Sequence, residues 1–182
     1  MKNAALTVNS LMKMKQDGEK IAMLTCYDAT FAATMDEAGV DIILVGDSLG
    51  MVVQGGSSTV GVEVEDIAYH TACVSQGLKR IFLVADMPFG SYHDPITAFE
   101  NAVTLLSAGG HMVKLEGAGP MIEVVEYLTS RGVPVCGHLG LTPQSVHQLG
   151  GYRVQARLEE EAQQLLRDAR ALQDAGAQLL VV

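Results

Sequence analysis

The sequence lacks several features that mark common protein classes. Its 182 residues include no tryptophan, and 12 Lys and Arg stand against 21 Asp and Glu, which gives a formal net charge of −9. No basic tract occurs, so a general nucleic-acid surface, which needs clustered positive charge, is not expected. No apolar run is long enough to span a bilayer, and residues 1–20 lack the continuous apolar core of a signal peptide. We therefore expect a cytoplasmic protein with no nucleic-acid and no membrane partner.

Cysteine is also scarce. The three cysteines, Cys26, Cys73 and Cys136, are far apart and form neither a CxxC pair nor a zinc-binding spacing. We expect reduced thiols, as in a cytoplasmic protein, that act as small buried packing residues rather than as nucleophiles.

A repeated pattern organises the chain. In five segments a helical stretch ends near glycine, which favours a left-handed helix cap, and an apolar strand follows. These strands are nearly continuous runs of Val, Ile and Leu, as expected when both faces of a parallel sheet are buried. The five segments span residues 36–47, 75–86, 107–117, 130–140 and 174–182, and an earlier strand is expected at 21–27.

Helices are expected between these strands. The clearest begins with Asp94 as N-cap and Pro95 at the first helical position, and another begins near Ala156. Six strands that alternate with helices predict an α/β fold with a parallel sheet. No shift in composition marks a boundary, so residues 1–182 are expected to form a single domain. The apolar residues expected on one face of the first helix are Ile96, Phe99, Val103 and Leu106.

Two long loops, 48–63 and 140–155, follow the second and fifth strands. In α/β barrels and in open α/β sheets the carboxyl ends of the strands carry the functional site. Long loops at that end are more often functional than accidental. A site is therefore expected between these loops.

Three successive strands end in acidic residues, namely Asp47, Asp86 and Glu116. Side chains alternate across a strand, so Lys114 shares a face with Glu116, and His138 on the fifth strand falls on the same face as Cys136. If these faces point into a barrel, three acids, a lysine and a histidine converge at its mouth. The same count assigns Ile43 and Val45 to the face of Asp47, and Phe82 and Val84 to the face of Asp86.

Several interpretations of these charges are open. One acid alone, such as Asp47 before Ser48, would fit a turn or helix cap, and Lys114 with Glu116 alone would fit a solvated edge strand. Three buried acids in successive strands would repel one another without a cation or bound protons, and oxygen ligands suit Mg²⁺. Lys114 offers a fixed positive charge to an anionic substrate. For His138 the alternative interpretation is a histidine that packs against the barrel and binds no ligand.

At these residues the chain resembles the ketopantoate hydroxymethyltransferases (3-methyl-2-oxobutanoate hydroxymethyltransferases). The similar blocks occur in the same order from about residue 20 to the end of the chain, and their ordered combination is highly specific. The resemblance implies a (β/α)₈ TIM barrel of the phosphoenolpyruvate/pyruvate type, with about six of the eight strands in this sequence. The blocks are MLTCYDATFA, GVDIILVGDSLGMVVQG, VEDIAYHTACV, ADMPFGSY, VKLEG and GHLGLTPQSVHQLGGYRVQ.

The resemblance also implies chemistry. The family uses Mg²⁺ to assist enolisation of 2-oxoisovalerate, whose C3 carbon then attacks the one-carbon unit of 5,10-methylenetetrahydrofolate to give ketopantoate. The positions matching the metal ligands are Asp47, Asp86 and Glu116, and those matching the substrate contacts are Asp47, Ser48, Asp86, Lys114 and His138.

The family's general base, a glutamate, is expected directly after Val182. The sequence therefore predicts an incomplete barrel with no catalytic base of its own and little transferase activity. Two alternatives are a different Mg²⁺-dependent 2-oxo acid enzyme of the same barrel superfamily, of the carbon–carbon lyase or phosphonomutase type, and an inactive chain that survives only in an assembly. Family members form homo-oligomers, commonly decamers.

Overall fold

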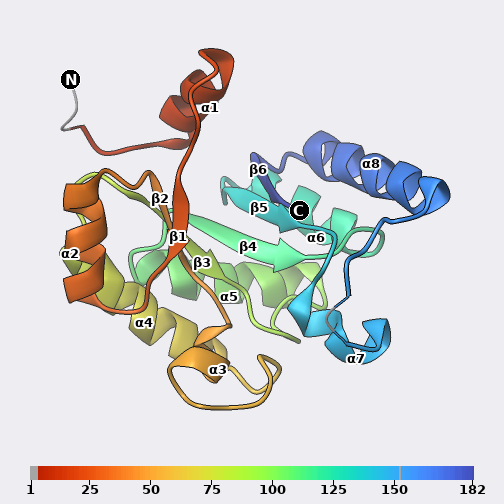
Figure 1. Ribbon diagram of the computed structural model, residues 1–182, viewed down its shortest axis with the longest axis horizontal. Coiled ribbons are helices and arrows are strands. Elements are labelled where there is room, and N and C mark those ends of the chain that lie inside the picture. Colours follow the sequence, from red (N-terminus) through yellow and green to blue (C-terminus); the bar gives the residue numbers. More distant parts are fainter. Residues whose placement is uncertain (1–3, 152) are drawn as a thin grey trace.

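The computed structural model describes residues 4–151 and 153–182, and within them the chain forms one parallel sheet of six strands. The strands lie side by side in the order of the sequence, which is the arrangement of a (β/α) barrel built by right-handed crossovers. The sheet curls into part of a barrel with β1 and β6 at its edges (Figure 1). The strands are β1 (Met23–Thr25), β2 (Ile42–Val45), β3 (Phe82–Asp86), β4 (Met112–Glu116), β5 (Val135–His138) and β6 (Leu179–Val181).

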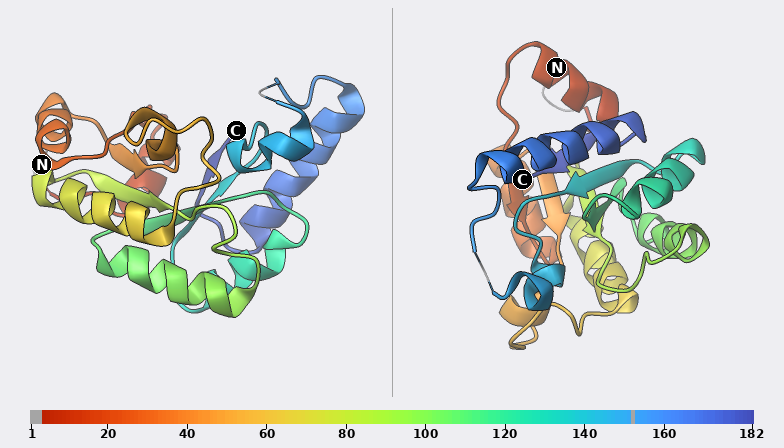
Figure 2. Two further views of the ribbon diagram at one scale, coloured as in Figure 1. Left: turned by 90° about the horizontal axis from the view of Figure 1, so that it is seen from below. Right: turned by 90° about the vertical axis from the view of Figure 1, so that its right-hand side faces the viewer.

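The helices lie mainly along the convex side of this sheet (Figures 1 and 2). The outer residues of the strands, such as Leu83, Val113 and Val135, are fully buried beneath them. The helices are α1 (Val8–Gln16), α2 (Ala29–Ala38), α3 (Leu49–Val52), α4 (Val64–Gly77), α5 (Pro95–Ser107), α6 (Met121–Ser130), η1 (Pro143–Ser145), α7 (Val146–Leu149) and α8 (Glu159–Asp174).

The concave side of the sheet holds a second, smaller apolar cluster. Phe82, Val84 and Met112 belong to it, and Leu11 of α1 packs against them from the amino ends of the strands. Thr7 caps α1, and the N–H of Leu6 donates to the carbonyl of Arg80, which ties this segment to the start of β3. Helix α1 therefore closes the barrel interior at the end opposite to α3 and α7, as Figure 1 shows.

The predicted glycine caps are confirmed at four of the five junctions. Gly39, Gly109, Gly132 and Gly176 all have positive φ angles, which glycine adopts without strain. At the junction after α4 the expectation was wrong, because Gly77 is the last helical residue and the extended Leu78 follows it. Glycine is needed there for close packing, since a Cβ atom at position 77 would collide with the carbonyl oxygen of Ala29 in α2.

Helix α5 begins as predicted, with Asp94 accepting hydrogen bonds from the N–H groups of Ile96 and Thr97. Phe99 and Leu106 pack against the core as expected, but the rest of the buried face differs from the expected one. Ile96 and Val103 are 62% and 44% exposed. The helix is rotated so that its small residues face the sheet, and the fully buried positions are Ala98, Ala102 and Leu105. Helix α8 begins at Glu159, three residues later than expected.

The two long loops form short helices at the carboxyl end of the sheet. Helix α3 follows β2 and helix α7 follows β5, and both lie at the same end of the sheet, opposite to α1 (Figure 1). All three cysteines are free thiols, and Cys26 and Cys136 are buried. In the described part of the chain no helix combines the length and hydropathy needed to cross a membrane.

Leu11→Ala should destabilise the chain by about 2–5 kcal/mol, because it leaves a cavity between α1 and the concave face of the sheet. Leu11 is only 2% exposed, whereas its neighbour Met12 is 43% exposed, so Met12→Ala is the matched control. Urea unfolding followed by circular dichroism measures both variants. Equal unfolding free energies for the two variants would contradict the role assigned to α1.

Candidate active site

Charged side chains gather at the carboxyl end of the sheet on its concave face. Asp86 of β3 is the register partner of Lys114 on β4, and Glu116 is the partner of His138 on β5. Partners on adjacent parallel strands point to the same face, so these four side chains form one row across three strands. Lys114 and Glu116 are both buried on an interior strand, which rules out a solvated edge strand.

Lys114 is the electrostatic centre of this row. Its Nζ lies 2.8 Å from Oδ1 of Asp86 and 3.5 Å from Oε1 of Glu116. Burial acts to lower the pKa of Lys114, but the carboxylates of Asp86 and Glu116 outweigh it and raise the pKa. The ammonium form of Lys114 is therefore favoured inside the barrel.

His138 completes the row through Glu116. Its Nδ1 lies 2.9 Å from Oε1 of Glu116 and 3.5 Å from Nζ of Lys114. An ionised carboxylate can only accept, so Nδ1 carries the hydrogen and donates it to Glu116. The longer approach of Nζ to Nδ1 is then a contact and not a hydrogen bond. His138 thus holds the side chain of Glu116 toward Lys114.

The acids carry more negative charge than Lys114 compensates. Burial raises the pKa of Asp86 to about 7, although the ammonium of Lys114 acts to lower it. Burial likewise raises the pKa of Asp47, against the opposing effects of Lys114 and Gln144. Both shifts show that a further positive charge at this place would be stabilising.

Asp47 reaches the site by a different route from the one expected. Strand β2 ends at Val45, and its concave face carries Ile42 and Leu44, the partners of Phe82 and Val84. The alternation expected for β2 was therefore wrong, because Ile43 and Val45 face the helices. The chain turns after Val45, and the N–H of Asp47 donates to Oδ2 of Asp86 at 3.1 Å. Asp47 consequently lies beside Asp86 despite the wrong parity.

Ser48 begins helix α3 and is half-buried at the same mouth. It lies beside Tyr27, which follows β1. Burial raises the pKa of the Tyr27 phenol, and hydrogen bonds with Thr25 and Ser48 act to lower it. The hydroxyl of Ser48 is thus hydrogen-bonded to Tyr27, and the backbone of Ser48 follows directly after Asp47.

Two residues of the site carry no sequence signal that singles them out. Gln144 lies in the loop after β5 and is 4% exposed, and its Nε2 donates to Oδ2 of Asp47 at 3.0 Å. Tyr92 lies after β3, is 8% exposed, and donates its hydroxyl hydrogen to Oε1 of Gln144. The position of Gln144 in one of the two long loops was the available hint, but nothing in its neighbours distinguishes it from Gln148.

The donor chemistry fits a hard divalent cation such as Mg²⁺. Asp47, Asp86 and Glu116 supply carboxylate oxygens, and their three formal negative charges face the single positive charge of Lys114. In the described residues no group of three or more His, Cys, Asp or Glu side chains is arranged as a ready-made metal cage. The carboxylates are instead turned toward Lys114, His138 and Gln144. The fit therefore rests on ligand type and charge.

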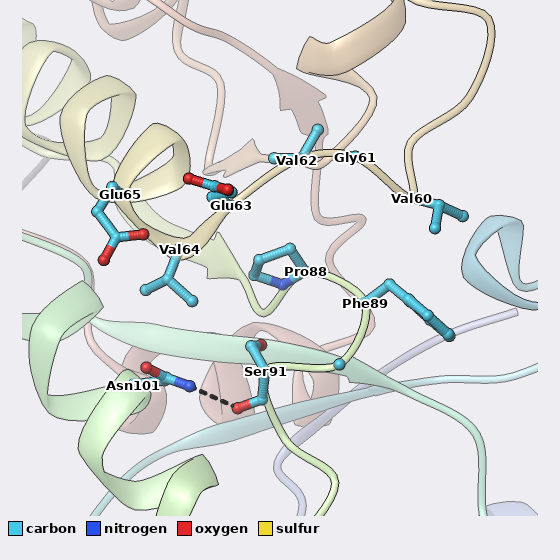
Figure 3. A pocket seen from close by; sticks show the side chains of 11 residues that line it. Val60, Gly61, Val62, Glu63, Val64, Glu65, Pro88, Phe89, Ser91 and Asn101 are labelled. Carbon is cyan, nitrogen blue, oxygen red and sulfur yellow. Dashed lines mark hydrogen bonds between the residues drawn. The ribbon is translucent and has the colours of Figure 1, made fainter.

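A separate cleft of about 600 Å³ lies beside this site, between the start of α4 and the segment after β3 (Figure 3). Figure 3 shows Pro88 and Ser91 facing Val64 across it, with Glu63 at its rim. None of the charged residues of the row lines the cleft. The chemistry therefore belongs to the barrel mouth.

Solved structures with a similar fold are barrel enzymes. A phosphonopyruvate hydrolase in complex with oxalate and Mg²⁺ has a TM-score of 0.72 and 12% identity, over 96% of this chain and 62% of that chain. A phosphoenolpyruvate phosphomutase from Streptomyces platensis has a TM-score of 0.70 and 13% identity, over 96% and 63%. These likenesses confirm the TIM-barrel fold that the sequence predicts.

Curated relatives match much more closely in sequence. The 3-methyl-2-oxobutanoate hydroxymethyltransferase 1 of Burkholderia cenocepacia (strain HI2424) is 58% identical over 98% of this chain, and that of Methylobacillus flagellatus is 61% identical over 95%. The chain spans 66% of the length of each relative. The profile of one family, described as ketopantoate hydroxymethyltransferase, matches residues 5–182. The chain therefore belongs to the ketopantoate hydroxymethyltransferase family.

Proposed function

We propose that the chain serves the transfer of a hydroxymethyl group from 5,10-methylenetetrahydrofolate to 2-oxoisovalerate, giving ketopantoate for pantothenate synthesis. The observation that carries this proposal is the buried contact of Lys114 with Asp86 and Glu116 at the carboxyl end of the sheet. It supports a site for a small anionic 2-oxo acid in a chain of this family.

Asp47, Asp86 and Glu116 are the residues proposed to hold Mg²⁺. When bound, the ion would supply a Lewis acid for a carbonyl oxygen and a positive charge close to developing negative charge. Burial makes the carboxyl groups of Asp47 and Asp86 harder to ionise, which raises their pKa values. A bound cation would offset this cost of burial, so the raised pKa values support the assignment.

Lys114 and Ser48 are proposed to orient the oxo acid, and His138 to line its pocket. The ammonium of Lys114 is already held between two carboxylates. It therefore does not need to move when an anion binds. Ser48 offers a hydroxyl at the edge of the mouth, and the Nδ1 hydrogen of His138 is already given to Glu116. His138 therefore positions Glu116, and removal of the C3 proton is assigned to none of the described residues.

The likeness to lyases and phosphomutases of the same barrel type raises a second candidate. Those structures are 12–18% identical to this chain and support the fold alone, whereas the hydroxymethyltransferases are 57–61% identical. We therefore favour hydroxymethyl transfer. We also propose, from the family resemblance, that the protein acts in the cytoplasm as a homo-oligomer.

Isothermal calorimetry of the chain with 2-oxoisovalerate, with and without Mg²⁺, tests the function. Binding of 2-oxoisovalerate that requires Mg²⁺ is the expected result. A clear preference for phosphonopyruvate over 2-oxoisovalerate under the same conditions would favour the phosphomutase alternative instead.

Asp86→Ala should weaken Mg²⁺-dependent binding of 2-oxoisovalerate by roughly 100-fold or more, because it removes a direct ligand rather than an outer contact. The same calorimetric titration measures it. Asp174→Ala, at the exposed end of α8, is the control and should bind like the unchanged chain. Full affinity in Asp86→Ala would make Asp86 a structural residue.

Lys114→Met should raise the pKa of the Asp86 carboxyl group above its value of about 7, because the ammonium 2.8 Å away that favours the charged form is lost. A pH titration of the side-chain ¹³C carboxyl signal measures this pKa. Lys13→Met, the control, removes an exposed ammonium of α1 that pairs with Asp17. It should leave the pKa of Asp86 unchanged. An unshifted or lowered pKa in Lys114→Met would contradict the electrostatic role of Lys114.

A further inference from the structure

Gln144 contacts the ends of three strands although it comes from a loop that follows a fourth. It belongs to η1, after β5, and its side chain is buried. Its Nε2 donates to Oδ2 of Asp47 and to the carbonyl oxygen of Met87, each at 3.0 Å. Its backbone N–H donates to Oε2 of Glu116 at 3.1 Å. One residue thus reaches the segments that follow β2 and β3 and the last residue of β4.

The orientation of the Gln144 amide is fixed by its partners. An ionised Asp47 carboxylate and the Met87 carbonyl can only accept, so the NH₂ group must face them and both of its hydrogens are used. The amide oxygen then faces Tyr92, whose hydroxyl donates to it. The same hydroxyl accepts the backbone N–H of Glu116 at 3.3 Å. Hydrogen bonds therefore run in one direction from Glu116 through Tyr92 and Gln144 to Asp47.

This arrangement opposes the repulsion between the acids. Buried like charges tend to move apart or take up protons. The side chain of Gln144 donates to Asp47 and its backbone N–H donates to Glu116, so the residue fixes one oxygen of each carboxylate. A side chain without donors at position 144 would leave the Asp47 carboxylate buried with one partner fewer, which is costly in a site of low dielectric constant.

We propose that Gln144 is a positioning residue whose side chain places Asp47, and whose backbone N–H places Glu116, at the barrel mouth for the proposed cation, with Tyr92 fixing the direction of its amide. The inference rests on the proposed metal site. This proposal also gives the loop after β5 a function in the site. When the loop packs against the sheet, Gln144 contacts the two carboxylates and fixes their positions.

Gln144→Met, which keeps the length of the side chain and removes its donors, tests this inference, with Mn²⁺ alone as the probe. The dissociation constant of Mn²⁺ should rise by about 10- to 100-fold, the usual effect of losing an outer contact to a metal ligand. The electron paramagnetic resonance spectrum of Mn²⁺ bound at saturation should also change, because the carboxylates around the ion have moved. Tyr92→Phe should shift both quantities in the same direction by a smaller amount.

Gln163→Met is the matched control, because Gln163 lies exposed on α8 and donates only to Glu159. It should leave the Mn²⁺ affinity and spectrum unchanged. If Gln144→Met lowers Mn²⁺ binding only in proportion to the fraction of unfolded chain, with an unaltered spectrum of the bound ion, Gln144 is merely structural and the inference is overturned.

A measurement without metal separates this inference from the proposed function. In metal-free chain at one pH, Gln144→Met should move the side-chain ¹³C carboxyl signal of Asp47, which loses its side-chain donor, but not that of Asp36. If the unchanged chain binds no Mn²⁺, the proposed metal site fails. Positioning of Asp47 by Gln144 then stands if the Asp47 signal moves and falls if it does not.

Discussion

The ammonium of Lys114 is the interaction on which the carboxyl end of this sheet depends. It lies 2.8 Å from Asp86 and 3.5 Å from Glu116 in a place where little water reaches. Removing one partner of a buried ion pair leaves the other uncompensated, and such changes are strongly destabilising. The surrounding fold supplies what Lys114 needs. Parallel strands in sequence order place its carboxylate partners on its own strand and the adjacent one, and the loops after β2 and β5 close over them.

The arrangement of charge also explains why the barrel mouth, and not the cleft beside α4, is the candidate site. Asp47 and Asp86 both have raised pKa values because burial is not fully offset by one lysine. A structural ion pair would be expected to have balanced charges. An excess of buried carboxylates over ammonium groups at the carboxyl end of a (β/α) sheet agrees with the proposed site for a cation and an anionic substrate.

Much of this could be predicted from the sequence, for reasons that are local. Apolar runs after glycine predict buried parallel strands, and alternation within β3, β4 and β5 places Asp86, Lys114 and His138 on the concave face correctly. Alternation failed for β2 because the strand ends at Val45, and a turn then redirects the chain toward the barrel mouth. Gln144 and Tyr92 could not be found this way. Their bonds join residues as far as 97 positions apart, and no periodicity encodes such contacts. The buried face of α5 was missed in part because two alanines, Ala98 and Ala102, pack beside Leu105, where larger residues were expected.

The most direct test of the central claim is a crystal structure of the chain soaked with Mn²⁺ and 2-oxoisovalerate, with anomalous scattering used to locate the ion. The account predicts one anomalous peak at the carboxyl end of the sheet, in contact with oxygens of Asp47 and Asp86, and the oxo acid beside Lys114. A peak elsewhere on the chain, or an oxo acid bound away from Lys114 with no ion between these acids, would contradict it.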